Sequence, residues 1–170
     1  MAALKKKGDL AELKIAADLM ERGYGIAVPW GEDCDFDLIA YRDDELHRVQ
    51  VKYTESDGRV ILVRCRSSSL TNGKVRSIKK YTARTIDWIA TWDRTSRESY
   101  YVPAAELGEG MEVISLRLTP ALNSQKLRVR YAEDYKAFGL ETAVSREQMR
   151  MEPAGFEPAT SDLQSPRSTN

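Results

Sequence analysis

The chain has 170 residues, 42% of them hydrophobic and 31% charged, which is enough to bury the core of one domain. No apolar run approaches the length that spans a bilayer, and the N-terminal segment MAALKKKGDL lacks the apolar core of a signal peptide. Two cysteines are too few for a disulfide framework. We therefore expect a cytoplasmic protein with reduced thiols and no membrane partner.

The hydrophobic periodicity predicts one helix near the N-terminus, over residues 8–22. Its apolar stripe comprises Leu10, Leu13, Ala17 and Met20, widened by Ile15, Ala16 and Leu19. Glu12 falls among the apolar side chains of this helix rather than on its solvated arc. A carboxylate in that position favours a role in a site.

The rest of the first 107 residues is expected to be mainly strands. The predicted strands cover residues 24–29, 36–41, 46–53, 59–65, 86–93 and 99–107, the last ending at Pro103 and running into a short helix. The strands over 36–41, 46–53 and 59–65 are expected to form one meander. Residues 66–74 are predicted as a loop with a turn at Asn72–Gly73, and residues 75–83 as a helix or an irregular segment. This order predicts an α/β fold with one mixed central sheet.

Beyond about Pro120 the pattern weakens. Residues 1–120 are expected to form the folded domain, and residues 121–141 an extension in which KLRVRY could add an edge strand. Residues 142–170 are polar and rich in Pro and Ser, and are expected to be a disordered tail. The peptide GFEPATSDLQS within it resembles a translation of the antisense strand of a tRNA gene; an ordinary tail is the alternative.

Acidic and basic residues are concentrated in different segments of the chain, although the formal net charge is zero. Residues 32–57 hold nine acidic and three basic residues, whereas residues 59–86 hold eight basic residues and no acidic ones. An acidic centre beside a basic surface suits a metal-dependent enzyme that acts on polyanions. The single histidine, His47, argues against a His/Cys zinc cluster.

The stretch HRVQVKYTE, residues 47–55, places Gln50 and Lys52 on one face of a strand, because side chains alternate along a strand. Asp37 opens the partner strand, and the short hairpin brings it near both. Glu12 reaches the same point if its helix packs on the sheet. Two carboxylates and a carboxamide oxygen form a hard-oxygen site that suits Mg²⁺ or Mn²⁺. Lys52 could orient or deprotonate the attacking water, or stabilise the charge on a phosphorane.

These residues resemble the PD-(D/E)XK nuclease superfamily, with Asp37 as the motif Asp, QVK at residues 50–52 and an upstream helix Glu at Glu12. The layout of residues 7–55 is similar to archaeal Holliday-junction resolvases. It is closer to homing endonucleases of bacterial group I introns, a group that tolerates Gln at the usual Asp/Glu position. The resemblance covers about residues 5–105 and implies a restriction-endonuclease-like core, with a central mixed sheet flanked by helices.

The resemblance implies a Mg²⁺-dependent DNA endonuclease that hydrolyses phosphodiester bonds and leaves a 3′-hydroxyl. Glu12, Asp37 and Gln50 would hold the metal, and Lys52 would activate water. Double-stranded or branched DNA is the implied substrate, and a homodimer or dimer of dimers the implied assembly. The basic run adds candidate DNA contacts at Arg64, Arg66, Ser67, Lys74, Arg76, Lys79, Lys80 and Tyr81.

Two departures from the family pattern keep alternatives open. Phe36 rather than proline precedes Asp37, and the neutral Gln50 leaves the site one negative charge short. A catalytically degenerate DNA-binding module is therefore one alternative; a junction resolvase and a small cytoplasmic protein without a nucleic-acid partner are others. Asp35 competes with Asp37, which is preferred because the apolar run follows it directly. Asp87 is interpreted as a structural hydrogen-bonding acid.

Overall fold

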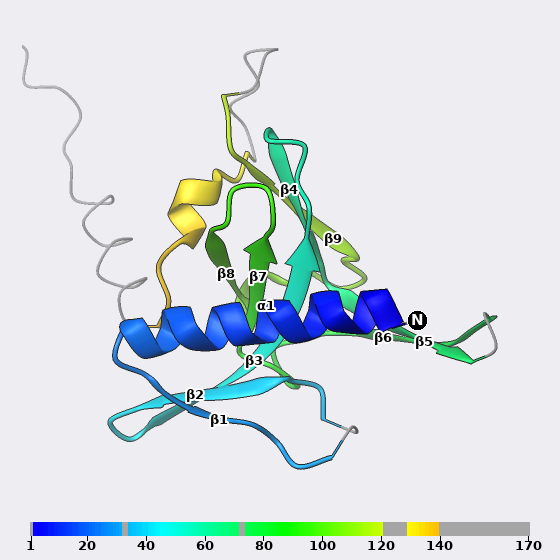
Figure 1. Cartoon of the computed structure of the whole chain (residues 1–170). Helices are drawn as coiled ribbons and strands as arrows, with labels where there is room; N and C mark the ends of the chain where they lie inside the picture. Colours follow the sequence, from blue (N-terminus) through cyan, green and yellow to red (C-terminus); the bar gives the residue numbers. More distant parts are fainter. Residues whose placement is uncertain (1, 32–33, 72–73, 121–128, 140–170) are drawn as a thin grey trace, which may run out of the picture. The chain divides into compact units, whose positions relative to one another are not determined.

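The computed structural model describes residues 2–31, 34–71, 74–120 and 129–139 (Figure 1). The chain divides into a unit over Met1–Phe138 and a second over Gly139–Asn170. The tail expected over residues 142–170 lies outside the described residues, as does the first half of the edge strand expected over 126–131. No helix in the described part is both long and apolar enough to cross a membrane.

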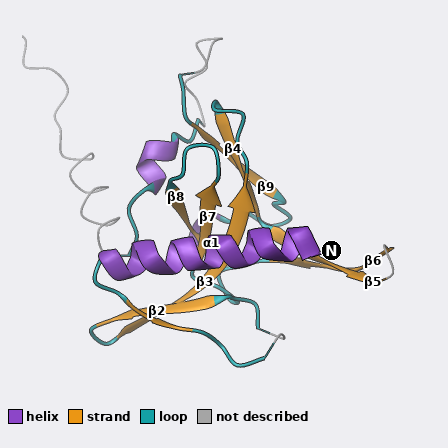
Figure 2. Cartoon of the chain, viewed as in Figure 1, coloured by secondary structure: helices purple, strands orange, loops and turns teal. Residues whose placement is uncertain are grey.

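The helix α1 (Ala2–Glu21) lies across one face of the central sheet (Figures 1 and 2). It begins well before the predicted start because the lysines of its first turns are good helix formers. Its fully buried side chains are Ala11, Ile15 and Leu19. Leu10, Leu13 and Met20, predicted as core, are instead exposed. The prediction is therefore right for Ile15 and Leu19 and wrong for the stripe of Leu10, Leu13 and Met20, and Glu12 does lie next to the buried side.

The central sheet has five strands in the order β1-β2-β3-β7-β8. Their bounds are β1 (Gly25–Ala27), β2 (Leu38–Arg42), β3 (Glu45–Thr54), β7 (Trp88–Asp93) and β8 (Ser99–Pro103). β3 and β7 are parallel and the other neighbours are antiparallel. The predicted mixed central sheet is therefore confirmed. The short helix expected after Pro103 is the 3-10 turn η1 (Ala104–Glu106).

A second, two-stranded sheet packs against the strands β7 and β8. It joins β4 (Val60–Arg64) to β9 (Val113–Arg117), a strand that the sequence analysis did not predict. The expectation that β4 extends the meander is wrong, because β7 occupies the free edge of β3. Ile61, Ile89 and Leu116 are fully buried in the core of this layer. This side of the sheet is thus covered by strands rather than by the predicted helix.

A β-ribbon replaces the predicted loop and helix that follow β4. β5 (Arg66–Thr71) pairs antiparallel with β6 (Lys74–Lys80), and Asn72–Gly73 lie outside the described residues. Figure 1 shows the ribbon extending away from the two sheets. A ribbon that lies on no core needs no apolar alternation, so the sequence carries little signal for it.

The folded unit continues past residue 120, where the sequence pattern weakens, to Phe138. The backbone N–H of Arg117 donates to the carbonyl of Arg130 at 2.8 Å, which returns the chain to β9. The 3-10 turn η2 (Ala132–Tyr135) follows, and both Tyr135 and Phe138 are buried in the cores. Residues 129–138 therefore belong to the folded unit.

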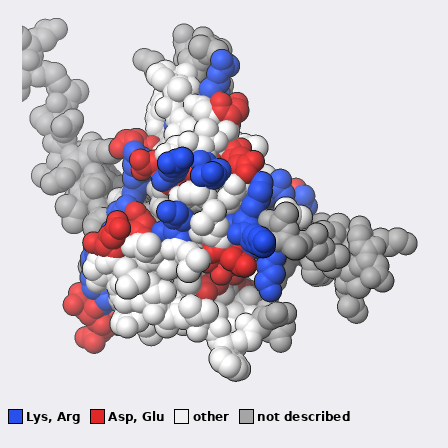
Figure 3. Space-filling model, in the orientation of Figure 1, with Lys and Arg blue, Asp and Glu red and all other residues white. Residues whose placement is uncertain are grey.

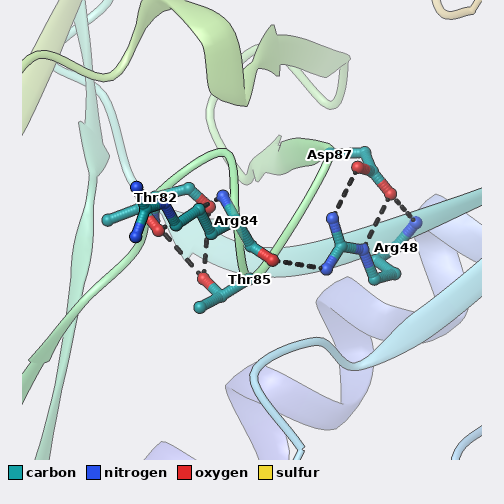
Figure 4. Close-up of polar contacts among 5 residues, drawn as sticks. All are labelled: Arg48, Thr82, Arg84, Thr85 and Asp87. Carbon is teal, nitrogen blue, oxygen red and sulfur yellow. Dashed lines mark hydrogen bonds and ion pairs between the residues drawn. The ribbon is translucent and has the colours of Figure 1, made fainter.

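The parallel pair of β3 and β7 is tied at its start by Arg48 and Asp87 (Figure 4). The Arg48 side chain donates to both carboxylate oxygens of Asp87, at 3.0 and 2.8 Å, and to the carbonyl of Arg84 at 2.7 Å. Burial acts to raise the pKa of Asp87, but the hydrogen bonds from Arg48 outweigh it and the pKa is lowered. Asp87 thus has the structural role expected, and the contact fixes the part of β3 that precedes Gln50.

Candidate functional site

The side chains of the predicted site come from three places in the fold. Glu12 is on α1, Asp37 lies directly before β2, and Gln50 and Lys52 are on β3. The backbone N–H of Asp37 donates to the carbonyl of Val49 at 3.0 Å. The hairpin therefore sets Asp37 beside Gln50, as the alternation along the strand predicts.

The Asp37 carboxylate is held by groups of β3. Its Oδ2 accepts a hydrogen bond from the backbone N–H of Val51 at 2.8 Å and another from Nε2 of Gln50. The same amide nitrogen donates to the Val51 carbonyl at 3.2 Å, and Gln50 is only 6% exposed. The Gln50 amide is thereby fixed with its nitrogen, not its oxygen, toward Asp37.

Burial raises the pKa of Asp37, against the opposing effects of the Val51 amide and the Lys52 charge. The pKa of Glu12 is raised as well, first by burial and then by the negative charge of Asp37. Asp9, one turn earlier on α1, adds to the effect on Glu12. Among the described residues, neither carboxylate of the pair Glu12 and Asp37 forms an ion pair. Two half-buried carboxylates, one of which raises the pKa of the other, are a favourable place for a cation.

The Lys52 ammonium group is held by Tyr81. Nζ donates to the Tyr81 hydroxyl at 2.9 Å and lies 4.8 Å from the centre of its ring. Tyr81 is only 6% exposed, as a core side chain would be, and this burial argues against stacking of its ring on a DNA base. Tyr81 follows β6 directly, and its backbone N–H donates to the Cys65 carbonyl at 3.1 Å. The base of the ribbon therefore meets the site at Lys52.

Lys52 also lines an open groove of about 520 Å³ between the start of α1 and the strands β3 and β4. Lys7 and Arg64 are the other cationic residues in its wall. Lys7 pairs with Glu55 at 2.7 Å, and both side chains remain about half exposed. The sequence analysis did not single out Lys7, because its place at the groove depends on the early start of α1.

The remaining predicted DNA-contact residues lie on the ribbon. Arg66 opens β5 and forms an exposed ion pair with Glu112 at 3.4 Å. Ser67 is half-buried, and Lys80 is exposed at the end of β6. Three further predicted contacts, Lys74, Arg76 and Lys79, lie on β6, and their side chains fall outside the described part.

The donor set fits a hard divalent cation. Within the described residues, no three His, Cys, Asp or Glu side chains gather as metal ligands, and the amide of Gln50 is the remaining oxygen donor of the predicted set beside Glu12 and Asp37. Carboxylate and amide oxygens suit Mg²⁺ or Mn²⁺, which keep several water ligands, better than they suit Zn²⁺. Since the nitrogen of Gln50 faces Asp37, the amide must turn to present its oxygen.

The fold and the arrangement of these residues define the class of restriction-endonuclease-like α/β proteins. A model of the PD-(D/E)XK endonuclease family matches residues 2–138, and the chain belongs to this family. The resemblance predicted from the sequence is therefore confirmed. Nucleases of this family generally use divalent metal ions.

Two solved structures are similar to this chain to different degrees. A bacterial homing endonuclease is similar over 88% of this chain and 98% of its own, with a TM-score of 0.61 and 19% identity. A Holliday junction resolvase of the archaeal hyperthermophile Archaeoglobus fulgidus aligns with 65% of this chain and 84% of its own, with a TM-score of 0.41 and 12% identity. A search of curated proteins gave no match.

Proposed function

We propose that the protein is a Mg²⁺-dependent DNA endonuclease, with Mn²⁺ able to replace Mg²⁺. The observation that carries the proposal is the grouping of Asp37, Gln50 and Lys52 on one hairpin, with Glu12 close enough for the charge of Asp37 to raise its pKa. Such a set supplies hard-oxygen ligands and a neighbouring ammonium group, which phosphodiester hydrolysis requires.

Each residue has a distinct task in this proposal. Glu12, Asp37 and Gln50 would hold the metal ion, which when bound would lower the pKa of a water molecule and polarise the scissile phosphate. Lys52, held by Tyr81, orients the attacking water and stabilises negative charge on the phosphorane. The bond from phosphorus to the 3′ oxygen breaks, and this oxygen takes up a proton to leave a 3′-hydroxyl.

The groove that contains Lys52 is the proposed binding surface for double-stranded or branched DNA. Lys7 and Arg64 in its wall would contact phosphates, because ammonium and guanidinium groups replace the counterions of the DNA backbone. The ribbon would add the contacts predicted for Arg66, Ser67, Lys74, Arg76, Lys79 and Lys80. We expect binding to weaken steeply with added salt.

Cutting both strands needs two sites, so we expect a homodimer or a dimer of dimers. We also expect the protein to act in the cytoplasm, where its thiols, the exposed Cys34 and the buried Cys65, stay reduced.

The proposal is tested by incubating the purified chain with supercoiled plasmid and with a four-way DNA junction. We expect nicked and linear products in Mg²⁺ or Mn²⁺ and none after EDTA, because the water is activated by the metal ion. Preference for the junction over linear duplex would identify a resolvase. Absence of cleavage in both ions would contradict the nuclease proposal.

The amide orientation of Gln50 favours one alternative function, a DNA-binding module of the same fold with a degenerate site. The Gln50 amide donates a hydrogen bond to the Asp37 carboxylate, and so occupies an oxygen atom that a metal ion would otherwise bind. Salt-sensitive DNA binding without cleavage in either ion would identify this module.

Tyr81→Phe is expected to slow cleavage about three- to tenfold, the effect of losing one hydrogen bond worth roughly 0.5–1.5 kcal/mol to the Lys52 ammonium group. DNA affinity should stay unchanged, because the ring is buried. Single-turnover cleavage and fluorescence anisotropy measure the two effects. Tyr53→Phe is the matched control, since the Tyr53 hydroxyl bonds Glu55 rather than Lys52. A wild-type rate for Tyr81→Phe would mean that the hydroxyl does not position Lys52.

A further inference from the structure

The side of α1 that faces away from the sheet carries a regular apolar seam. This outer seam consists of Leu10, Leu13, Ala17 and Met20. Leu13 is 70% exposed, Met20 62% and Leu10 38%, and Ala17 is exposed as well. Leu10 borders a pocket that Trp92, Arg94 and Arg97 also line, whereas Leu13, Ala17 and Met20 remain exposed. A helix that lies on a sheet needs only one apolar side, so a second one calls for a partner.

The spacing of the outer seam is that of a helix pairing with another helix. Its members follow one another after three, four and three residues, the alternation of the a and d positions of a coiled coil. The same alternation made this stripe look like the core in the sequence. The outer seam thus has the spacing of a buried stripe, but the residues that pack on the sheet are Ala11, Ile15 and Leu19, on the other side of the helix.

We propose that the outer seam is a self-association surface on which α1 of a second copy packs antiparallel, forming a symmetric homodimer. The net charges of the helix favour this orientation: its N-terminal part carries Lys5, Lys6 and Lys7 against the single acid Asp9, although Lys7 already pairs with Glu55, whereas its last turn carries Glu21. Figure 3, in which α1 faces the viewer, shows basic atoms near the N-terminal end of the helix with acidic atoms beside them, and both kinds of atoms near its C-terminal end. Antiparallel packing sets opposite charges beside each other, and parallel packing sets like charges together.

The sizes of the seam residues also favour the antiparallel arrangement. A two-fold axis at the level of Ile15 places Leu13 against Ala17 of the partner subunit and Leu10 against Met20 of the partner subunit. A large side chain then meets a small one in each inner layer, and the two-fold axis repeats both contacts. In a parallel pair, Ala17 would face its own copy and leave a gap in the seam.

This arrangement leaves the catalytic side of each chain free, because Glu12 lies next to the buried side of α1 rather than on the outer seam. It deepens the homodimer proposed for cutting both strands. The measurement of mass uses neither metal nor DNA, so its outcome is separate from that of the nuclease proposal.

The test is sedimentation equilibrium of the full chain over a range of concentrations. We expect wild type to reach twice the chain mass of 19.2 kDa, and Leu13→Lys and Met20→Lys to remain at the chain mass over the same range. Leu46→Lys is the matched control: Leu46 is also 70% exposed but lies at the start of β3, and the variant should dimerise as wild type does. Because these side chains are exposed within one chain, all three variants should keep the far-UV circular dichroism spectrum of wild type, whereas the melting temperature of the two seam variants should fall with the lost association.

The orientation is tested by charge reversal and by cross-linking. Lys6→Glu should raise the dimer dissociation constant about two- to fivefold, and Lys6→Glu combined with Glu21→Lys should restore it. In a Cys34→Ser background, Leu13→Cys with Ala17→Cys should form disulfide dimers, whereas Leu13→Cys alone should not. A monomeric wild type, a dimeric Leu13→Lys variant, or efficient cross-linking through Leu13→Cys alone would each overturn the proposal.

Discussion

Lys52→Ala is expected to lower the rate of DNA cleavage by at least about 10²-fold, the usual contribution of a positioned group that orients a proton-transfer partner or stabilises developing charge. The ammonium group is held against the hydroxyl and ring of Tyr81, next to the carboxylate of Asp37. Alanine removes the charge from the reacting centre and leaves the proposed metal ligands in place. Single-turnover cleavage of a labelled duplex at saturating protein measures the effect.

Lys7→Ala is the matched control for Lys52→Ala. Lys7 lines the same groove and its side chain is 46% exposed, but it pairs with Glu55 at the groove edge rather than with the site. Losing it should weaken DNA binding and reduce its salt dependence, while the single-turnover rate at saturation changes little. A Lys52→Ala variant that cleaves at the wild-type rate would contradict the assigned roles. So would a Lys7→Ala variant whose single-turnover rate falls as far as that of Lys52→Ala.

The parts of the fold that were predicted correctly depend on contacts close in sequence. The hairpin of β2 and β3 joins strands by a short turn, so alternation along each strand was enough to bring Asp37 beside Gln50. Glu12 was recognised by a similar local argument, since one turn of helix relates it to Ile15 and Ala16. These residues needed no knowledge of how distant segments pair.

The parts that were missed depend on pairing between distant segments. β4 joins β9 rather than β3, and Tyr81 meets Lys52 although 29 residues separate them. No periodicity within one segment records which strand it will join. The two sides of α1 are a different case. Both are apolar, and the sequence alone could not tell the side that packs on the sheet from the outer seam.

Gln50→Glu is expected to tighten the binding of Mg²⁺ by about tenfold or more, because ligand charge sets the affinity of a carboxylate site. It also replaces the hydrogen bond from the amide to Asp37 by a second carboxylate. In the metal-free protein this raises the pKa of Asp37 further, since one of the two neighbouring carboxylates must retain a proton. The folded state then binds more protons than the unfolded state, so its stability falls as the pH rises through the raised pKa.

The melting temperature, measured with and without Mg²⁺ at pH 5.5 and pH 8, separates these effects. The metal-free variant should lose more stability than wild type between the two pH values, and Mg²⁺ should restore more of it. Gln50→Met, similar in size but without a charge or an amide, is the matched control and should gain nothing from Mg²⁺ beyond wild type. Equal Mg²⁺ effects in wild type and Gln50→Glu would mean that Gln50 is not a metal ligand. Cleavage by both proteins would show that a neutral amide sustains the reaction. If Gln50→Glu cleaves DNA and wild type does not, the natural site is inactive because it lacks one negative charge.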